Sequence, residues 1–482
     1  MTSTWTSKNI PPGGKQNVFP TTASPEHRSP THRKAFRIGL ITASAGLLVG
    51  LDTGLISEAL GFIGNDFHAS IRDQEWIVSV LMIGASVGSL GAGTFSARFG
   101  RRLVLMMAMV LMFIGAGLCA DAFHLSQILV GRLLIGVAIG ICTFTAPLYI
   151  SETMSGHLRG SMVSTFSMLQ SAGILAGYLL GSILSSGGHW RWMVSMPMLP
   201  AALLFTGCLF LPPSPSWLIA RGQDDRVREV LRSLRDTPAE VEQEFNSLKQ
   251  EAGKGHVSGL TLLRQQPNFR RSVLLGICLQ VMQQLTGINV VMYYMPKILQ
   301  NAQFGISGAA WATVLIGVIN TVVGIAAIFL VNRWGRRPLL CTSAAIMAIS
   351  LTIAAIITGL HLPGMSATLC LLCALLVFVG GFGLGAGPLV WTLCSEIQPL
   401  EGRDFGVGCS TLANWWADWG VSNTFLSLVS VIGFGQTFAG FAFMNVVFIV
   451  FTLMFVPETK DVSLETIETN LLAGKKLRDI GR

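Results

Sequence analysis

Twelve apolar runs recur along this chain, and each is long enough to cross a lipid bilayer as a helix. A helix needs about 20 residues to span the hydrocarbon core, because it rises about 1.5 Å per residue. Only 12% of the 482 residues are charged, against about a quarter in soluble proteins, which leaves too few to cover a soluble surface of this size. The runs therefore predict an all-α membrane protein with twelve transmembrane helices. We expect these helices at 37–63, 75–96, 103–121, 127–150, 160–184, 193–212, 272–299, 308–331, 338–360, 367–395, 404–430 and 437–456.

One long charged segment separates the sixth apolar run from the seventh, and its composition favours helices. The N-terminal segment is polar and rich in Pro and Gly, so it has too little apolar surface to fold alone. The predicted organisation is a disordered cytoplasmic N-terminal tail (1–36), an N-terminal six-helix bundle (37–212), a cytoplasmic helical connector (213–270), a C-terminal six-helix bundle (271–457) and a cytoplasmic C-terminal tail (458–482).

The basic residues predict the orientation, because cytoplasmic loops of membrane proteins carry an excess of Lys and Arg. With a cytoplasmic N-terminus, the inside segments hold the basic clusters, whereas the outside loops hold little beyond Arg72 and Arg191. We therefore predict a multi-pass protein of the cytoplasmic (inner) membrane with both termini inside. The net charge of +8 comes from these short clusters, and their placement does not indicate a nucleic-acid partner.

A short repeat indicates two related halves. The segment Arg98-Phe99-Gly100-Arg101-Arg102 follows the second span, and Arg333-Trp334-Gly335-Arg336-Arg337 follows the eighth. The same signal six spans apart predicts two pseudo-symmetric six-helix halves in parallel orientation, with a solute site between them near the middle of the membrane.

Longer motifs in both halves are specific for one family. They include Gly50-Leu51-Asp52, Gln74-Glu75-Trp76, Gly131-Arg132, Gln283-Gln284-Leu285-Thr286-Gly287-Ile288-Asn289, Gly387-Pro388-Leu389-Val390-Trp391, Gly402-Arg403-Asp404-Phe405-Gly406 and Pro457-Glu458-Thr459-Lys460. On these motifs the chain resembles the sugar porter family of the major facilitator superfamily, especially its bacterial galactose–proton symporters. The resemblance implies the major facilitator fold, transport by alternating access and a monomeric protein.

Asp52 and Arg132 are predicted to lie inside the bilayer, where an unpaired ionised group costs several kcal/mol. Pairing would make both tolerable, and protonation of Asp52 would release the arginine. We predict a proton-coupling role, and the resemblance favours it because the matching aspartate marks proton symporters. The alternative is a permanent ion pair that only orients helices.

Three carboxamides, Gln283, Gln284 and Asn289, lie close together in the seventh span. Their spacing would not align them on a regular helix, but Gly287 allows a break that turns all three toward a cavity. Carboxamides donate and accept hydrogen bonds, which suits vicinal sugar hydroxyls. The alternative is that they bond neighbouring helices. The remaining candidates for substrate contacts, some implied by the resemblance, are Asn320, Asn414 and Trp391.

Trp391 follows Pro388, where we expect a kink that serves gating; the indole face would stack on a pyranose, although membrane tryptophans are more often packing residues or anchors. A second predicted gating group forms cytoplasmic charge networks that hold the outward-facing state, or alternatively serves only as a topology signal. It consists of Arg98, Arg101, Arg102, Glu152, Arg159, Arg333, Arg336, Arg337, Glu396 and Arg403. The family motif adds Tyr293 and Tyr294 to the gating residues.

Three departures from the family pattern bear on the substrate. Ser167 stands where a sugar-binding glutamine is usual, and Gln170 one turn later is its candidate replacement. Asp418 replaces a second asparagine after Asn414, and Glu58 replaces a small residue. These two acids would bind a cationic or more polar solute, titrate as a second proton site, or face lipid headgroups.

The sequence thus predicts a secondary active transporter that couples protons to uptake of a monosaccharide, a hexose such as galactose or glucose, or a related polyol. A uniporter of the same fold, a transporter of a charged non-sugar solute and a membrane sugar sensor stay open as alternatives. No metal cluster, nucleotide-binding loop or nucleophile elbow is recognisable, so we expect neither an enzyme nor a cofactor. The expected partners are the sugar or polyol, protons and the lipid bilayer.

Overall fold

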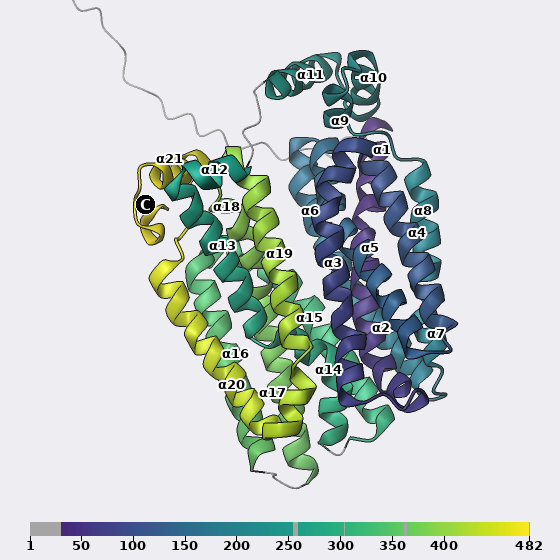
Figure 1. Ribbon diagram of the computed structural model, residues 1–482. Coiled ribbons are helices and arrows are strands. Elements are labelled where there is room, and N and C mark those ends of the chain that lie inside the picture. The colour runs from purple at the N-terminus through teal and green to yellow at the C-terminus, as the bar shows by residue number, and fades with distance from the viewer. Residues whose placement is uncertain (1–29, 254–258, 303, 361–363, 482) are drawn as a thin grey trace, which may run out of the picture.

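A computed structural model describes residues 30–253, 259–302, 304–360 and 364–481. Two helical bundles stand side by side, and the helices α9, α10 and α11 cover one end of the first (Figure 1). We call the end that carries these three helices the connector end and the opposite end the far end. The described chain begins and ends at the connector end (Figure 1).

The first bundle, here the N-half, contains eight helices. They are α1 (Pro30–Ala43), α2 (Ala45–Asp66), α3 (Ile71–Phe99), α4 (Arg101–Ala120), α5 (Leu125–Thr153), α6 (Gly156–Ser185), α7 (Trp190–Ser195) and α8 (Met198–Leu209). The long spans pair α2 with α6 and α3 with α5. Because α1 and α2 are nearly continuous, as are α7 and α8, these eight helices make six passes along the bundle.

The second bundle, here the C-half, is more interrupted. Its elements are α13 (Pro267–Leu285), α14 (Ile288–Asn301), α15 (Ile306–Trp334), α16 (Arg336–Gly359), α17 (Met365–Gly381), a π-helical turn (Phe382–Ala386), α18 (Gly387–Glu396), a 3-10 turn (Leu400–Gly402), α19 (Arg403–Ser422) and α20 (Phe425–Phe455). These also make six passes, since α13 continues into α14 and α17 into α18.

In the described chain, four short α-helices connect the bundles, and one α-helix and a 3-10 turn (Leu477–Asp479) follow the last pass. The α-helices are α9 (Pro215–Ala220), α10 (Asp224–Leu234), α11 (Pro238–Gly253), α12 (Gly259–Gln265) and α21 (Leu464–Leu472). The first three are fixed to the N-half: Trp217 lies over Gly100, and its ring nitrogen donates to the carbonyl of Ala97 at 3.0 Å.

Eleven segments of the described chain are long and apolar enough to span a membrane. The twelfth pass is α19, which has 20 residues but carries Arg403, Asp404 and Asp418, so its apolarity falls below that of the others. The chain is therefore an all-α, multi-pass membrane protein with the predicted twelve passes.

Two predicted boundaries are wrong. The tail predicted to be disordered as far as residue 36 is helical from Pro30, because proline suits the first turn of a helix and Ala35 is buried against the N-half; residues 1–29 lie outside the described chain. The eleventh span ends at Ser422 rather than at residue 430, and α20 starts at Phe425. Gly433 has a positive φ of 81° inside α20, so residues 425–432 form a separate helical segment before that kink.

Glycines let α2 and α6 approach until their backbones touch. A Cβ atom added to Gly50 would lie 1.9 Å from the carbonyl oxygen of Gln170, and one on Gly173 would lie 2.2 Å from that of Leu47. Small residues at such crossings increase the van der Waals contact that holds membrane helices together.

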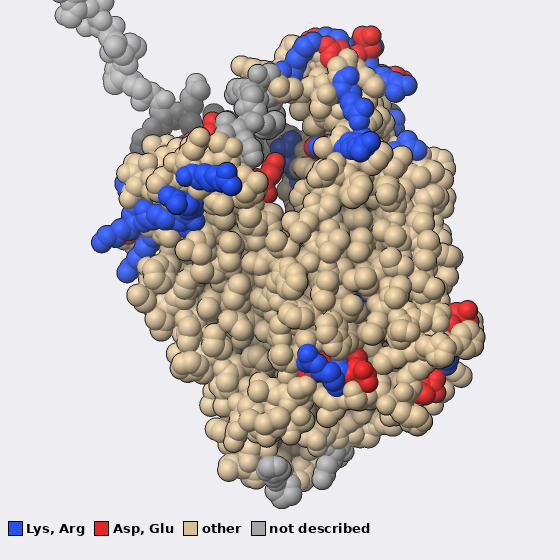
Figure 2. Space-filling view, viewed as in Figure 1, with Lys and Arg blue, Asp and Glu red and all other residues tan. Residues whose placement is uncertain are grey.

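The two halves are joined toward the far end. There α3 packs on α19, α6 on α15 and α2 on α14. Among the described residues, the hydrogen bonds between the halves occur from the middle of the bundles to the far end, and Ser79 donating to Asn423 at 3.0 Å is one of them. At the connector end the surface is hollowed between the halves (Figure 2). The structure is thus closed at the far end and open toward the connector end.

We predict that Gly50→Ala lowers the melting temperature in detergent, because the added methyl group collides with the backbone of α6 and overpacking costs about 1–3 kcal/mol. Gly61→Ala, on the same helix, is the matched control, since no atom lies within 4 Å of its added Cβ. Equal melting temperatures for the two variants would contradict the close crossing.

Candidate functional site

Asp52 of α2 and Arg132 of α5 form a buried ion pair in the N-half. Arg132 Nη1 lies 2.7 Å from Oδ1 and 2.8 Å from Oδ2 of Asp52, and Arg132 Nε donates to the carbonyl of Ile77 at 3.1 Å. The two side chains are 7% and 2% exposed. The carboxylate and guanidinium therefore neutralise each other inside the helix bundle, as the sequence suggested.

A small cavity adjoins this pair on its far-end side. It has about 10 Å³ of space, enough for about one water molecule, and Cys119 and Trp190 are among the residues that line it. Arg132 Nη2 is buried without a protein partner among the described residues. Arg132 Nη2 thus has no described protein partner and lies in a residue that lines a cavity large enough for one water molecule.

The seventh span is broken where the sequence predicted. α13 ends at Leu285, Gly287 adopts the left-handed conformation with φ 87°, and α14 begins at Ile288. The break frees the carbonyl of Thr286, which accepts from Asn445 Nδ2 at 3.2 Å. Sequence analysis missed Asn445, and an amide within the last apolar run was the signal for it.

Gln283 joins three helices in the C-half. Its Nε2 donates to the carbonyls of Ala386 at 2.7 Å and Gly387 at 3.2 Å, where the π-helical turn meets α18. Asn414 Nδ2 donates to Oε1 of Gln283 at 3.2 Å and to Oε1 of Gln280 at 2.7 Å. Gln280, another residue that the sequence analysis missed, is fully buried and is also hydrogen bonded to Cys394.

Gln284 and Asn289 are also brought together, since Asn289 Nδ2 donates to Gln284 Oε1 at 2.9 Å. Within the described chain, Gln284 Nε2 makes no hydrogen bond, and neither does the side chain of Asn320 on α15. These groups are free to donate to a solute. The amides thus fall into the two groups that the sequence analysis left as alternatives. Gln283 and Asn414 bond neighbouring helices, whereas Gln284, Asn289 and Asn320 retain polar atoms that could bond a solute.

Four predicted site residues stand apart from this amide cluster. Trp391 is 43% exposed on α18, after exposed Pro388, and no hydrogen bond joins it to the amides among the described residues. On α6 of the N-half, Ser167 is exposed and Gln170 is half-buried. The hydrogen bonds found in the described chain likewise do not link either of these α6 side chains to the C-half amides.

The two unexpected acids are both buried in protein, so the reading in which they face lipid headgroups is wrong. Asp418 is 1% exposed and accepts from Ser422 Oγ at 3.0 Å and from Asn289. Glu58 is 4% exposed. Asp418 and Glu58 both lie at contacts between helices, and the order of apolar and polar residues in the sequence does not show which face of a helix such a contact uses.

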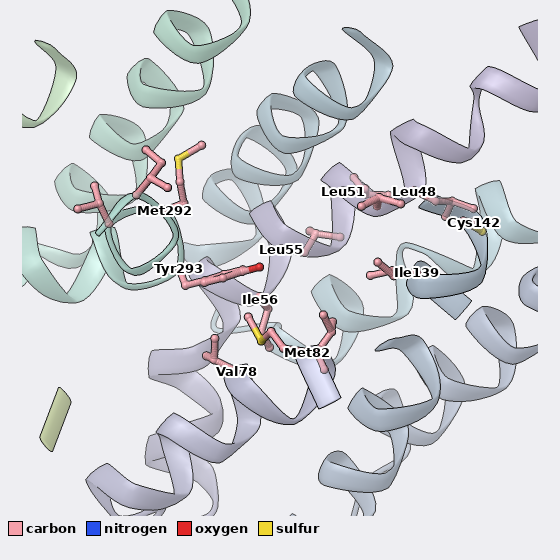
Figure 3. Packing of buried hydrophobic residues seen from close by; sticks show 14 of the residues in the cluster. Leu48, Leu51, Leu55, Ile56, Val78, Met82, Ile139, Cys142, Met292 and Tyr293 are labelled. Carbon is pink, nitrogen blue, oxygen red and sulfur yellow. The ribbon is translucent and has the colours of Figure 1, made fainter. Parts of the chain in front are cut away.

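The two predicted gating tyrosines have different surroundings. Tyr293 reaches from α14 across to α2, with its hydroxyl near Leu55 and Ile56 (Figure 3), and it is hydrogen bonded to Thr53. Tyr294 stays within the C-half, where its hydroxyl donates to the carbonyl of Ser422 at 2.9 Å. Tyr293 therefore links the C-half to the residue next to Asp52.

At the connector end, each half has its own ion pair. Arg101 lies 2.6 Å from Glu152, and Arg336 lies 2.9 Å from Glu396. Glu458 accepts from the backbone nitrogens of Arg336 and Arg337, at the start of α16, although sequence analysis gave it no such role. The other predicted members of the networks, Arg98, Arg102, Arg159, Arg333, Arg337 and Arg403, make no ion pair with a described carboxylate.

In this open arrangement no ion pair joins the two halves at the described connector end, so the predicted charge networks that hold the outward-facing state stay a prediction. At the far end, by contrast, the halves are linked by a buried acid that the sequence analysis had noted without a role. Glu75 is fully buried and accepts from the backbone nitrogen of Ser427 at 2.6 Å and from its hydroxyl at 2.7 Å. Closure at one end thus accompanies opening at the other.

Comparisons with known proteins agree in length and fold. A sequence model of the family described as "Sugar (and other) transporter" matches residues 38–471. The galactose-proton symporter of Escherichia coli (strain K12) is 44% identical over 447 residues, covering 92% of this chain and 96% of the relative. The arabinose-proton symporter of the same strain is 38% identical over 467 residues, covering 95% and 98%. The partially occluded inward-open conformation of the xylose transporter XylE from E. coli has a TM-score of 0.78 and 27% identity, covering 89% of this chain and 99% of that one.

We predict that Arg132→Met lowers the melting temperature more than the double variant Asp52→Leu with Arg132→Met. Removing one partner of a buried ion pair typically costs about 3–5 kcal/mol, whereas replacing both with apolar groups is often nearly neutral. Thermal unfolding of the purified variants measures the difference. Additive effects of the two substitutions would show that the pair is not energetically coupled.

Proposed function

Because the chain belongs to the sugar transporter family of the major facilitator superfamily, we propose that it is a proton-coupled monosaccharide symporter that works by alternating access. Its function is transport rather than enzymatic catalysis. The observation that carries the coupling is the buried Asp52–Arg132 pair, because its two charges depend on each other and a proton on Asp52 would remove one of them.

The coupling runs through Tyr293. Protonation of Asp52 weakens its attraction for Arg132, so α2 and α5 are less strongly held together. Thr53, the next residue on α2, is hydrogen bonded to Tyr293 of α14. Asn289 lies one turn earlier on α14, among the amides with unused polar atoms. A shift of α2 is thereby transmitted to the proposed sugar site in the other half.

We propose a hexose as substrate, with galactose as the first choice. The galactose-proton symporter is the relative at 44% identity, and the polar atoms left over in the site belong to neutral amides, which suit sugar hydroxyls. Asp418 already accepts hydrogen bonds from Ser422 and Asn289, so we do not assign it to a cationic solute.

The remaining roles extend the same proposal. Gln284, Asn289 and Asn320 bind the sugar directly, Gln283 and Asn414 hold the cluster in place, and Trp391 contacts the ring from α18. Gln170 and Ser167 face the sugar from the N-half. The protein resides in the inner membrane as a monomer in contact with the lipid bilayer, with the connector end and both termini in the cytoplasm, because the basic clusters lie at that end.

We predict that adding galactose to energy-depleted cells that produce this protein makes the medium more alkaline, because a proton enters with each transported sugar. Asp52→Asn abolishes this pH change and leaves sugar exchange across the membrane, since the neutral side chain imitates the protonated acid. A panel of hexoses, pentoses and polyols checks the substrate. Uptake without a pH change would identify a facilitator, and no response to the panel would refute the sugar substrate.

We predict that Gln284→Leu raises the KM for the transported sugar by about tenfold, because it removes about 1–2 kcal/mol of hydrogen bonding. Gln398→Leu is the matched control: this buried amide of the same half bonds to Ser272 near the connector end. Its KM stays at the native value. Equal KM changes in both variants would place Gln284 outside the sugar site.

A further inference from the structure

Glu58 occupies the contact surface between the halves, which we call the seam. Its side chain leaves α2 and crosses Gly181 of α6, where an added Cβ would lie only 2.6 Å from Glu58 Cγ. The carboxyl then comes within hydrogen-bonding reach of Thr313 on α15, in the C-half. A carboxyl group on one half therefore ends against the other half.

The seam around Glu58 is sealed in this structure. Tyr178 Oη donates to the carbonyl of Met292 at 2.8 Å, and Ser182 Oγ donates to the carbonyl of Ala310 at 2.8 Å. Both bonds leave α6 within one turn of Gly181 and end on the C-half. Because alternating access separates the halves at the far end, these bonds must break and Glu58 must then meet water.

Among the described residues, no Lys or Arg lies beside the Glu58 carboxyl. The carboxyl is buried, and Thr313 is its polar neighbour. From the middle of the bundle to the far end, where Glu58 lies, the charged groups on α2 and on the helices packed against it have other partners: Asp52 pairs with Arg132, Asp66 with Arg191 and Arg72 with Glu75. Asp73 is bonded to Ser70, and Lys297 to Gln74 near Glu75. The tyrosines there, Tyr178, Tyr293 and Tyr294, are neutral phenols. An ionised carboxylate here would be buried without a counter-charge, which costs several kcal/mol.

The hydrogen bonds also indicate the protonated acid. Thr313 uses its only hydroxyl hydrogen to donate to the carbonyl of Ala309 at 2.8 Å. That hydroxyl hydrogen is therefore not free to stabilise an ionised Glu58. The Oε1 atom of Glu58 is buried without a partner among the described residues, as suits the carbonyl oxygen of a neutral acid better than a carboxylate.

We propose that Glu58 is a second proton-binding site, separate from Asp52, and that the far end closes only when Glu58 carries a proton. The inference rests on the proposed alternating access and adds a site to it. Closing the seam forms one O–H bond on Glu58, and opening it returns the proton to water on the far side. Since the seam is sealed while the connector end is open, this proton does not cross the membrane and does not add to the coupling ratio.

Sugar exchange at equal pH on both sides of proteoliposomes tests the proposal. The Asp52→Asn background removes the first proton site. In that background, exchange of labelled galactose falls with rising pH, by up to about tenfold per pH unit once Glu58 ionises. Adding Glu58→Gln makes exchange independent of pH, whereas adding Glu58→Asp keeps a pH dependence. Asp66→Asn, a carboxyl at the end of the same helix, is the control and leaves the fall in place. A fall that persists with Glu58→Gln overturns the proposal.

Infrared spectroscopy of the purified protein in lipid gives a readout that needs no transport. The carbonyl band of protonated carboxylic acids at neutral pH is weaker in Glu58→Gln than in the native chain and keeps its native intensity in Asp66→Asn; Asp418 contributes equally to all three spectra. Identical native and Glu58→Gln spectra in this region overturn the proposal whatever the protein transports. Failure of the native chain to exchange any monosaccharide refutes the proposed function instead, and the infrared band then decides the protonation of Glu58.

Discussion

Inside a bilayer every polar group must find its partner within the protein, and this constraint shapes the site as much as any ligand does. The broken seventh span leaves the carbonyl of Thr286 outside a regular helix. Asn445 supplies a donor to Thr286, and Gln283 donates to Ala386 and Gly387 beside the π-helical turn. The irregular backbone that forms a solute site is therefore stable because side-chain amides complete its hydrogen bonds.

The same constraint divides the amides into two groups. Gln283 and Asn414 have several protein partners, so they hold α13, α18 and α19 in register. Gln284, Asn289 and Asn320 keep polar atoms without described partners, and a solute with several hydroxyls can satisfy them. Two buried acids follow the rule differently: Asp52 is balanced by Arg132, whereas Glu58 is not balanced by any described cation, which is why we propose that it carries a proton.

The sequence predicted the large features well, because each has a strong local signal. Apolar length predicted the passes, Gly287 predicted the break between α13 and α14, and the burial cost of a charge predicted the Asp52–Arg132 contact. Features that depend on packing between distant segments were not predictable. The helix from Pro30 is explained by burial of Ala35, the pairing of Glu75 with Ser427 joins residues of opposite halves, and the absence of charge contacts across the connector end depends on which conformation is present.

The glycine crossing of α2 and α6 has a mechanical consequence. Backbone touches backbone at Gly50 and Gly173, so there is no side chain at these points that could change rotamer and absorb a displacement. The two helices must therefore move together as one rigid body. One face of this α2–α6 pair carries Asp52. Another face is hydrogen bonded to the C-half through Tyr178 and Ser182. If a change in the charge of Asp52 moves α2, then α6 and its hydrogen bonds to the C-half are displaced by the same amount.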